Sequence, residues 1–304
     1  RCWRSCADTG TSPAHRLRIW ICARSMHYDF PVQWRGDARR AAAGSLVRQI
    51  GGRLPIPVAR HFYRALACLP FVVPRRAVGG VPFHGAELRR WQRRAWWGSA
   101  LSRTLKDRLA RGDDRGLDRA VLPVDWSPLE AALSRGRGVV VVGAHIGPGG
   151  VVPWALSKRF PNTLSLIGVR GDKPHHLRVH DVIADKSRAT ALAAGRLALR
   201  RGGIVYVSAD GGFGAQCSEL EALGFAVRIG EGAPTLSRLC GAPTVPACAL
   251  WQGARIRVEL AAPILPVAAE PAVWRREWIE AYCRWLNEVD RGAEKVDLDA
   301  GDWS

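Results

Sequence analysis

Three polar residues follow apolar runs of the sequence, and their side chains could together carry out acid–base chemistry on an anionic substrate. His145, Arg170 and Asp210 each come shortly after such a run. Histidine is a base that titrates near neutral pH, and arginine binds phosphate in a bidentate manner. If the runs are strands of one parallel sheet, the three residues meet at its carboxyl edge, where open α/β sheets bind their ligands.

Each residue also has an ordinary alternative. His145 could be a loop histidine in the glycine-rich stretch GAHIGPGG, and Arg170 could be a surface charge. Asp210 could belong to a plain turn with Gly211 and Gly212. The occurrence of all three after successive runs is what favours a common site.

Apolar runs and amphipathic helices alternate from residue 128 onward, which is typical of an α/β fold. The unbroken run Val139–Val142 predicts a central strand that is buried on both faces. We therefore expect a central, mostly parallel sheet flanked by helices. The expected strands lie at 138–143, 164–169, 204–209, 225–229, 244–251 and 255–261. The expected helices lie at 128–135, 150–160, 174–183, 187–201, 233–240 and 272–290.

Helical periodicity dominates the chain before this part. Residues 40–72 place apolar side chains at steps of three and four, interrupted by Gly51-Gly52 and by prolines. Residues 86–111 predict a longer amphipathic helix. Its apolar face is formed by Leu88, Trp91, Ala95, Leu101, Leu105 and Leu109.

Three segments are expected from these patterns. Residues 1–25 have no clear periodicity and are predicted to be an unstructured leader or upstream translation, since the only methionine is Met26. Residues 26–120 form a helical, membrane-associating region. Residues 121–304 form the α/β domain, in one structural unit with the preceding helices.

The composition is strongly basic, with 45 Lys and Arg against 27 Asp and Glu and a net charge of +18. Such a charge attracts nucleic acid, anionic lipid or acidic proteins, although an arginine-rich composition alone could account for part of it. The eight cysteines show no spacing typical of zinc or of a disulfide framework, which fits a reducing compartment. The sequence contains no stretch of 18 apolar residues, so no membrane span is predicted.

The helix at 86–111 favours a membrane partner among these classes. Trp91, Trp96 and Trp97 stand beside its arginines, and indole and guanidinium groups together suit the headgroup region of an anionic bilayer. The same pattern also fits a helix packed on the core with one solvated face. A nucleic-acid partner is not expected, because no recognition motif is found and the basic residues are spread through the chain.

Four blocks occur in order: LEAALSRGRGVVVVGAHIGPGG, IGVRGDKP, ALRRGGIVYVSADGGFGA and VRIGEGAPTLSRLCGAPTVPACAL. Together they resemble the lipid A biosynthesis (lauroyl/myristoyl-type) acyltransferase family. That family belongs to the lysophospholipid/glycerolipid acyltransferase superfamily and includes phosphatidylinositol mannoside acyltransferases. The resemblance spans roughly residues 45–290. It implies a glycerolipid acyltransferase-like fold and an O-acyltransferase activity.

The resemblance also implies roles for individual residues. His145 matches the general base, Arg170 and Asp210 match the second and third blocks, and Pro246 matches the proline of the fourth. The family places an acid five residues after the histidine, where it holds the productive tautomer. This sequence has Gly150 there.

Two groups could replace the missing acid. Asp210 and Glu231 are the carboxylates that the sequence offers for orienting His145, and we expect Asp210 to be the substitute. If neither reaches His145, the protein binds lipid without turnover.

Substrate contacts are expected from glycines and basic residues. Backbone N–H groups of Gly147, Gly149 and Gly150 could hold the oxyanion, or these glycines could form a plain turn. Arg170, Lys173 and Arg228 could bind a phosphate of donor or acceptor. Lys173 and Arg228 fit a solvated surface equally well.

The sequence thus predicts transfer of a fatty acyl chain from acyl-CoA or acyl carrier protein to a hydroxyl of a membrane lipid or glycolipid. The expected location is the cytoplasmic face of the plasma membrane, as a peripheral protein. No metal or redox cofactor is expected. A lipid-binding protein without turnover and a basic nucleic-acid-binding protein are the alternatives.

Overall fold

The computed structural model describes most of the α/β part and the helices before it. The described residues are 46–47, 49–69, 85–144, 147–148, 150–167, 178–181, 188–209, 217–222, 225–252, 255–267 and 270–299. His145, Gly149, Arg170, Lys173 and Asp210 lie outside them, as does the predicted leader at 1–25. The side chain of Arg228 is also outside the description.

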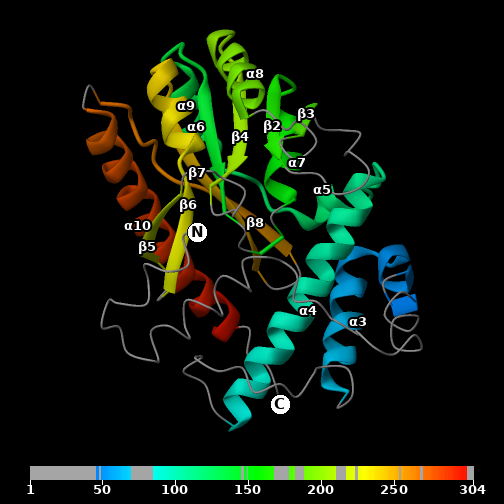
Figure 1. The fold of residues 1–304 in the computed structure, drawn as a ribbon. Coiled ribbons are helices and arrows are strands. Elements are labelled where there is room, and N and C mark those ends of the chain that lie inside the picture. Colours follow the sequence, from blue (N-terminus) through cyan, green and yellow to red (C-terminus); the bar gives the residue numbers. More distant parts are fainter. Residues whose placement is uncertain are drawn as a thin grey trace.

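A six-stranded sheet forms the centre of the molecule, in the order β3-β2-β4-β1-β7-β8 (Figure 1). Neighbouring strands from β3 to β7 pair in parallel, and β8 pairs with β7 antiparallel. The strands are β1 (Val139–Gly143), β2 (Thr163–Ile167), β3 (Arg178–Asp181), β4 (Ile204–Ser208), β7 (Thr244–Gln252) and β8 (Arg255–Leu260). This confirms the expected mostly parallel sheet with helices on its faces.

Helices cover both faces of this sheet, since β1 alternates its valines between two cores. Val140 and Val142 pack with α8 (Arg188–Arg200), α9 (Gly232–Cys240) and α10 (Pro271–Asp299). Val139 and Val141 face the other core. That core is formed with the end of α4 (Gly85–Ala110), α5 (Leu117–Ala120), α6 (Ser127–Leu133) and α7 (Val151–Arg159).

A two-stranded antiparallel hairpin stands apart from the main sheet. It pairs β5 (Cys217–Ala222) with β6 (Phe225–Gly230), and α10 packs against β5. The sequence predicted β6 but treated the residues of β5 as loop. The alternating polar residues of CSELEA give no apolar run that would mark a strand.

One predicted helix is wrong. Residues 178–181 of the expected helix at 174–183 form strand β3, at the edge of the sheet beside β2. Edge strands are often short and polar, so the segment RVHD carries little of the pattern of a strand. The other expected helices and strands of the α/β part agree with the structure to within a few residues wherever it describes them, except that α10 extends to Asp299, nine residues beyond the expected end at 290.

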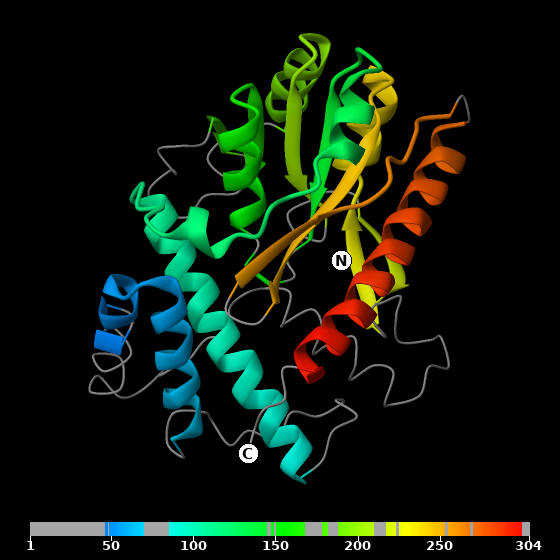
Figure 2. The same ribbon diagram turned by 180° about the vertical axis from the view of Figure 1, so that it is seen from behind.

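The helices before the sheet form a small bundle at one side, opposite α10 (Figures 1 and 2). Residues 49–53 are helical, and α3 (Ile56–Cys68) follows after Leu54-Pro55 and packs along α4. The break therefore lies at Leu54-Pro55 and not at Gly51-Gly52. A Cβ on Gly51 would overlap the ring of Tyr63, so this glycine permits the helices to approach closely.

Arg108 ties this bundle to the rest of the protein. Its buried guanidinium pairs with Asp113 at 3.2 Å and donates to the carbonyl oxygens of Leu54 and Arg115 at 3.3 and 2.7 Å. The pKa of Asp113 is lowered to about 2, first because Arg115 donates to the carboxylate and further because of Arg108, while burial opposes the shift. A buried charge whose partner is removed is costly, so this ion pair matters for stability.

We expect Asp113→Asn to reduce the dependence of stability on acid pH. A carboxylate with a lowered pKa stabilises the fold above its unfolded pKa near 3.8, and that contribution is lost as pH falls toward about 2. Wild type should therefore lose about 1–2 kcal/mol more than the variant over this interval. Urea unfolding near neutral pH and near pH 2 measures the difference. Asp118→Asn, at an exposed position of the same segment, is the control, and equal pH slopes for wild type and Asp113→Asn would contradict the assignment.

Candidate functional site

The three strands that precede His145, Asp210 and Arg170 are adjacent and parallel. β4 lies between β1 and β2, and the register pairs Gly143 with Ser208 and Leu166 with Val207. The strands thus end together at the same edge of the sheet. In sequence, His145 and Asp210 follow these ends by two residues and Arg170 follows by three. The strand order therefore brings together, at one edge of the sheet, the three strand ends that precede these residues in the sequence.

The carboxyl edge of the sheet faces the half of the molecule that holds α3 and α4, as the arrowhead of β4 shows in Figure 2. Leu109, near the end of α4, lies beside Gly150, which directly precedes α7. The edge and the basic helix are therefore neighbours.

The last residue of β1 is fixed from both faces of the sheet. The buried hydroxyl of Tyr282 on α10 donates to the carbonyl oxygen of Gly143 at 2.9 Å. The ring and hydroxyl of Tyr206 on β4 occupy the space that a Cβ of Gly143 would need. Gly143 is therefore required by packing, and the two tyrosines define where the following loop begins.

Gly147 is fixed by a close approach of two backbones. It adopts φ +59°, a conformation that L side chains rarely take, and a Cβ there would overlap the carbonyl oxygen of Ala249 on β7. This steric need accounts for the glycine. Its predicted role as an oxyanion donor remains a prediction.

Gly150 has no such requirement. It caps α7 with φ −67°, is exposed, and a Cβ there would meet only the Leu109 Cδ1 atom at an ordinary 3.6 Å. The position at which the family carries an acid is thus open to a side chain. The absence of a carboxylate there is a property of the sequence and not a consequence of crowding.

Asp114 anchors the helix that follows this loop. Its carboxylate accepts a hydrogen bond from the Trp154 indole at 3.1 Å and pairs with Lys158 at 2.8 Å, both on α7. The pKa of Asp114 is lowered mainly by the hydrogen bond from Lys158, and also by that from Trp154. Sequence reasoning missed this contact, because residues 114 and 154 are related only through the fold.

Glu231 is held by other partners. Its carboxylate accepts a hydrogen bond from Ser218 at 3.2 Å and pairs with Arg275 of α10 at 2.9 Å. These contacts join β5, the start of α9 and α10, and they engage both carboxylate oxygens of Glu231. The hairpin register places residue Arg228 of β6 opposite residue Glu219 of β5.

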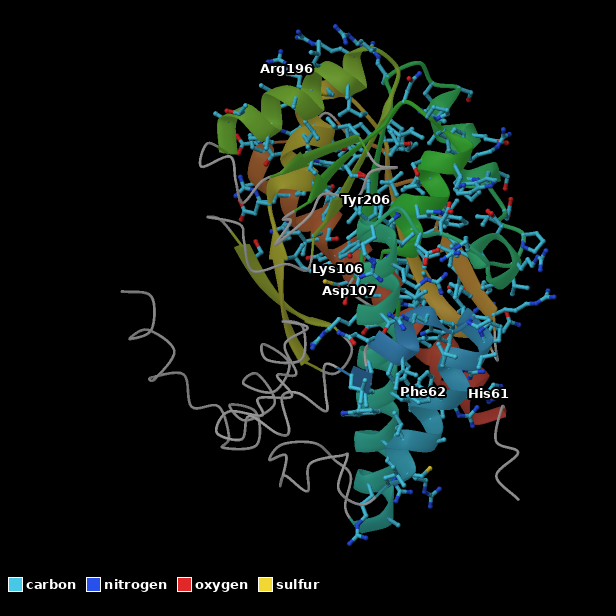
Figure 3. All side chains as sticks on the ribbon, turned by 90° about the vertical axis from the view of Figure 1, so that its right-hand side faces the viewer. His61, Phe62, Lys106, Asp107, Arg196 and Tyr206 are labelled. Atoms are coloured by element: carbon cyan, nitrogen blue, oxygen red, sulfur yellow. The ribbon has the colours of Figure 1, made fainter. Side chains whose placement is uncertain are left out.

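Charged residues of α4 also lie near the edge. Figure 3 shows Lys106 and Asp107 of α4 below Tyr206 of β4, and both charged side chains are exposed. Leu105 and Leu109 on the same stretch of α4 share a core with Tyr206. In sequence, Lys106 and Asp107 belong to the polar face of this amphipathic helix. Tyr206 is the aromatic residue of the strand IVYVS, and this was the feature of the sequence that set it apart from its neighbours.

The described residues contain neither a cluster of metal-ligating side chains nor a helix that could span a membrane. Within that part of the chain, no group of three or more His, Cys, Asp or Glu side chains is arranged to hold a metal ion. None of the helices described is long and apolar enough to cross a membrane.

No family model matches this chain, and no curated protein matches it.

Proposed function

We propose that the protein is an O-acyltransferase that uses His145 as a general base. The imidazole takes the proton of a lipid or glycolipid hydroxyl while the oxygen attacks the carbonyl carbon of an acyl thioester. The tetrahedral intermediate collapses, the C–S bond breaks, and the proton passes to the departing thiolate of coenzyme A or of an acyl carrier protein. One ester and one thiol are formed, and no oxidant or metal is consumed.

The observation that carries this proposal is the strand order β2-β4-β1. This order brings three strand ends to one edge of a parallel sheet, where ligands of such sheets bind. In sequence, these strand ends are followed by a base, a carboxylate and a cation. His145 and Asp210 follow directly adjacent strands, which suits a carboxylate that orients an imidazole. Arg170 follows the strand on the far side of β4, which suits a cation that binds phosphate.

The proposed substrates imply a location at the cytoplasmic face of a membrane. A fatty acyl acceptor sits in a bilayer, and acyl-CoA and acyl carrier protein are anionic donors, so a basic protein on the inner face of the plasma membrane would meet both. A lipid-binding protein without turnover is the second candidate. Gly150 favours it, because the orienting acid of the family is missing from a position that has room for one.

The test is acyl transfer to membrane lipids, with a double-mutant cycle on the missing acid. Purified protein is given long-chain acyl-CoA or long-chain acyl–acyl carrier protein, together with vesicles of total membrane lipid. Thiol release is followed, and acylated lipid is identified by mass spectrometry. If Asp210 orients His145, Asp210→Asn lowers turnover by about 10²-fold or more, and Gly150→Glu restores part of it.

The four proteins of the cycle discriminate between the roles of Asp210. A gain from Gly150→Glu that is larger in the Asp210→Asn background supports substitution of the missing acid. Equal gains in both backgrounds would show that Asp210 serves Arg170 or its own turn instead. If wild type has no turnover but Gly150→Glu has, the protein is the lipid-binding candidate. If neither protein has turnover with either donor, the acyltransferase proposal fails.

A further inference from the structure

The basic charge of this protein is concentrated in its first part. Residues 1–111 carry 22 Lys and Arg against 5 acids, whereas residues 112–304 carry 23 against 22. The basic residues themselves are spread through the chain, but nearly the whole excess of +18 lies before the sheet. A composition bias alone would raise both parts alike, so it does not explain this division.

The described helices of the first part also expose apolar side chains. Along α3, one stripe is buried, and Val58, His61, Ala65 and Cys68 form an exposed stripe at steps of three and four. His61 lies on the outer side of α3 in Figure 3. Val58 is 48% exposed and Leu69, directly after the helix, is 38% exposed. Eleven residues are close to three turns, so Val58 and Leu69 lie on the same side.

The preceding helical turns expose two further apolar side chains. Leu46 and Ile50 are 57% and 41% exposed and stand one turn apart. Gly51 packs on Tyr63 of α3, and the Arg111 guanidinium at the end of α4 lies 3.8 Å from a Cβ placed on Gly52. Exposed apolar side chains and a guanidinium group thus occur together in one small bundle.

Two of the tryptophans predicted to meet a membrane, Trp96 and Trp97, do not provide this surface. Trp96 packs edge-on against Tyr63, and Trp97 lies under the Arg60 guanidinium at 5.5 Å, so both are used between α3 and α4. The side chain of Trp91 lies outside the described residues. α4 instead exposes Arg89, Arg90 and Arg93 along its first half.

We infer that the exposed apolar side of residues 46–69 inserts into an anionic bilayer, with the arginines of α4 on its headgroups. Leu46, Ile50, Val58 and Leu69 form this insertion surface. An anionic bilayer is the partner that uses both features, because it binds guanidinium groups at its surface and apolar side chains just below. A nucleic acid would use the charge and leave the aliphatic side chains in water.

The insertion surface connects to the candidate site through α4, whose end lies beside Gly150. The carboxyl edge of the sheet is therefore adjacent to the helix bundle that would dock on the bilayer, from which a lipid acceptor would enter. This inference deepens the proposed function by naming the docking surface for its membrane partner. Its test measures binding and no turnover, so either proposal can fail alone.

Vesicle co-sedimentation of the full chain tests the inference. Wild type should bind phosphatidylcholine vesicles that contain phosphatidylglycerol, bind pure phosphatidylcholine much less, and be released at ~1 M salt, where the Debye length is about 3 Å. The pair Val58→Asp and Leu69→Asp should lower the partition coefficient about tenfold or more, because each change removes apolar burial and adds a repelling charge.

The matched control has the same chemistry elsewhere. Leu197 on α8 and Leu239 on α9 are 51% and 52% exposed, and these helices lie at the opposite end of the molecule from α3 (Figure 1). The pair Leu197→Asp and Leu239→Asp adds the same charge and should change binding only by about twofold. Thermal unfolding of each variant verifies the fold. If the α3 pair unfolds, Leu46→Ser with Ile50→Ser takes its place and should also weaken binding severalfold.

Three outcomes would overturn the inference. One is equal loss of binding in the α3 pair and the control pair, which would show a general effect of charge. Another is no binding of wild type to anionic vesicles. The third is tighter binding to duplex DNA than to anionic vesicles at the same salt concentration, unchanged in the α3 pair, which would assign the basic helices to nucleic acid.

Discussion

Replacing His145 by alanine is expected to reduce acyl transfer by about 10²–10⁴-fold, the contribution of a positioned general base. The side chain that accepts the hydroxyl proton is lost, while the thioester and the lipid still bind. The fold should be retained, because β1 ends at Gly143 and is held there by Tyr206 and Tyr282. Thiol release and product mass spectrometry measure the loss, and thermal unfolding verifies the fold.

A matched control is available in the same chain. Arg196 is exposed on α8, at the far end of the molecule from α3 in Figure 3, and Arg196→Ala removes a side chain that neither the proposed chemistry nor the proposed docking surface uses. Its turnover should equal that of wild type. Undiminished turnover in a folded His145→Ala protein would remove the base from the mechanism.

Replacing Gly147 by alanine is expected to destabilise the protein by about 3 kcal/mol and to lower turnover severely. Its φ of +59° costs an L residue about 1–2 kcal/mol, and the added Cβ would overlap the carbonyl oxygen of Ala249. That oxygen belongs to the backbone of a buried strand and cannot move aside, so the loop itself has to shift. His145 is in this loop, which is why activity should fall with stability.

Gly150→Ala is the matched control for this change. It lies in the same stretch, has a φ of −67°, and its Cβ would make only an ordinary contact with Leu109. Stability should change by less than about 1 kcal/mol, since alanine fits this conformation. Urea unfolding of both variants measures the difference, and equal destabilisation would refute the steric account of Gly147.

The centre of the fold could be predicted from sequence because burial on both faces leaves a continuous signal. The valines of β1 and the aliphatic stretches of β4 and β7 mark strands without knowledge of their partners. β3 and β5 could not be found in this way, since their residues are largely polar and their pairing depends on distant segments. Gly51 and Gly52 suggested a break that does not occur, because Tyr63 on α3 fits against Gly51.

The candidate site was predictable only as a set of positions. The sequence placed His145, Arg170 and Asp210 after apolar runs, and the strand order now makes those runs neighbours. It could not indicate Asp114, Tyr206 and Tyr282, whose contacts join residues far apart in the chain. For Trp96 and Trp97, the sequence allowed either contact with a membrane or packing within the protein. The structure shows both packed against residues of α3.

The hydrogen bond from the Tyr282 hydroxyl to the Gly143 carbonyl oxygen also has a consequence for biosynthesis. β1 leaves the ribosome early, but its two strand partners come from 204–208 and 244–247, and the hydroxyl that holds its end comes still later. A nascent chain therefore carries all three candidate residues long before their strand ends are secured. Translation that stops ahead of α10 yields a product that lacks the hydroxyl holding the end of β1, so we expect the proposed activity to arise only after α10 has been synthesised.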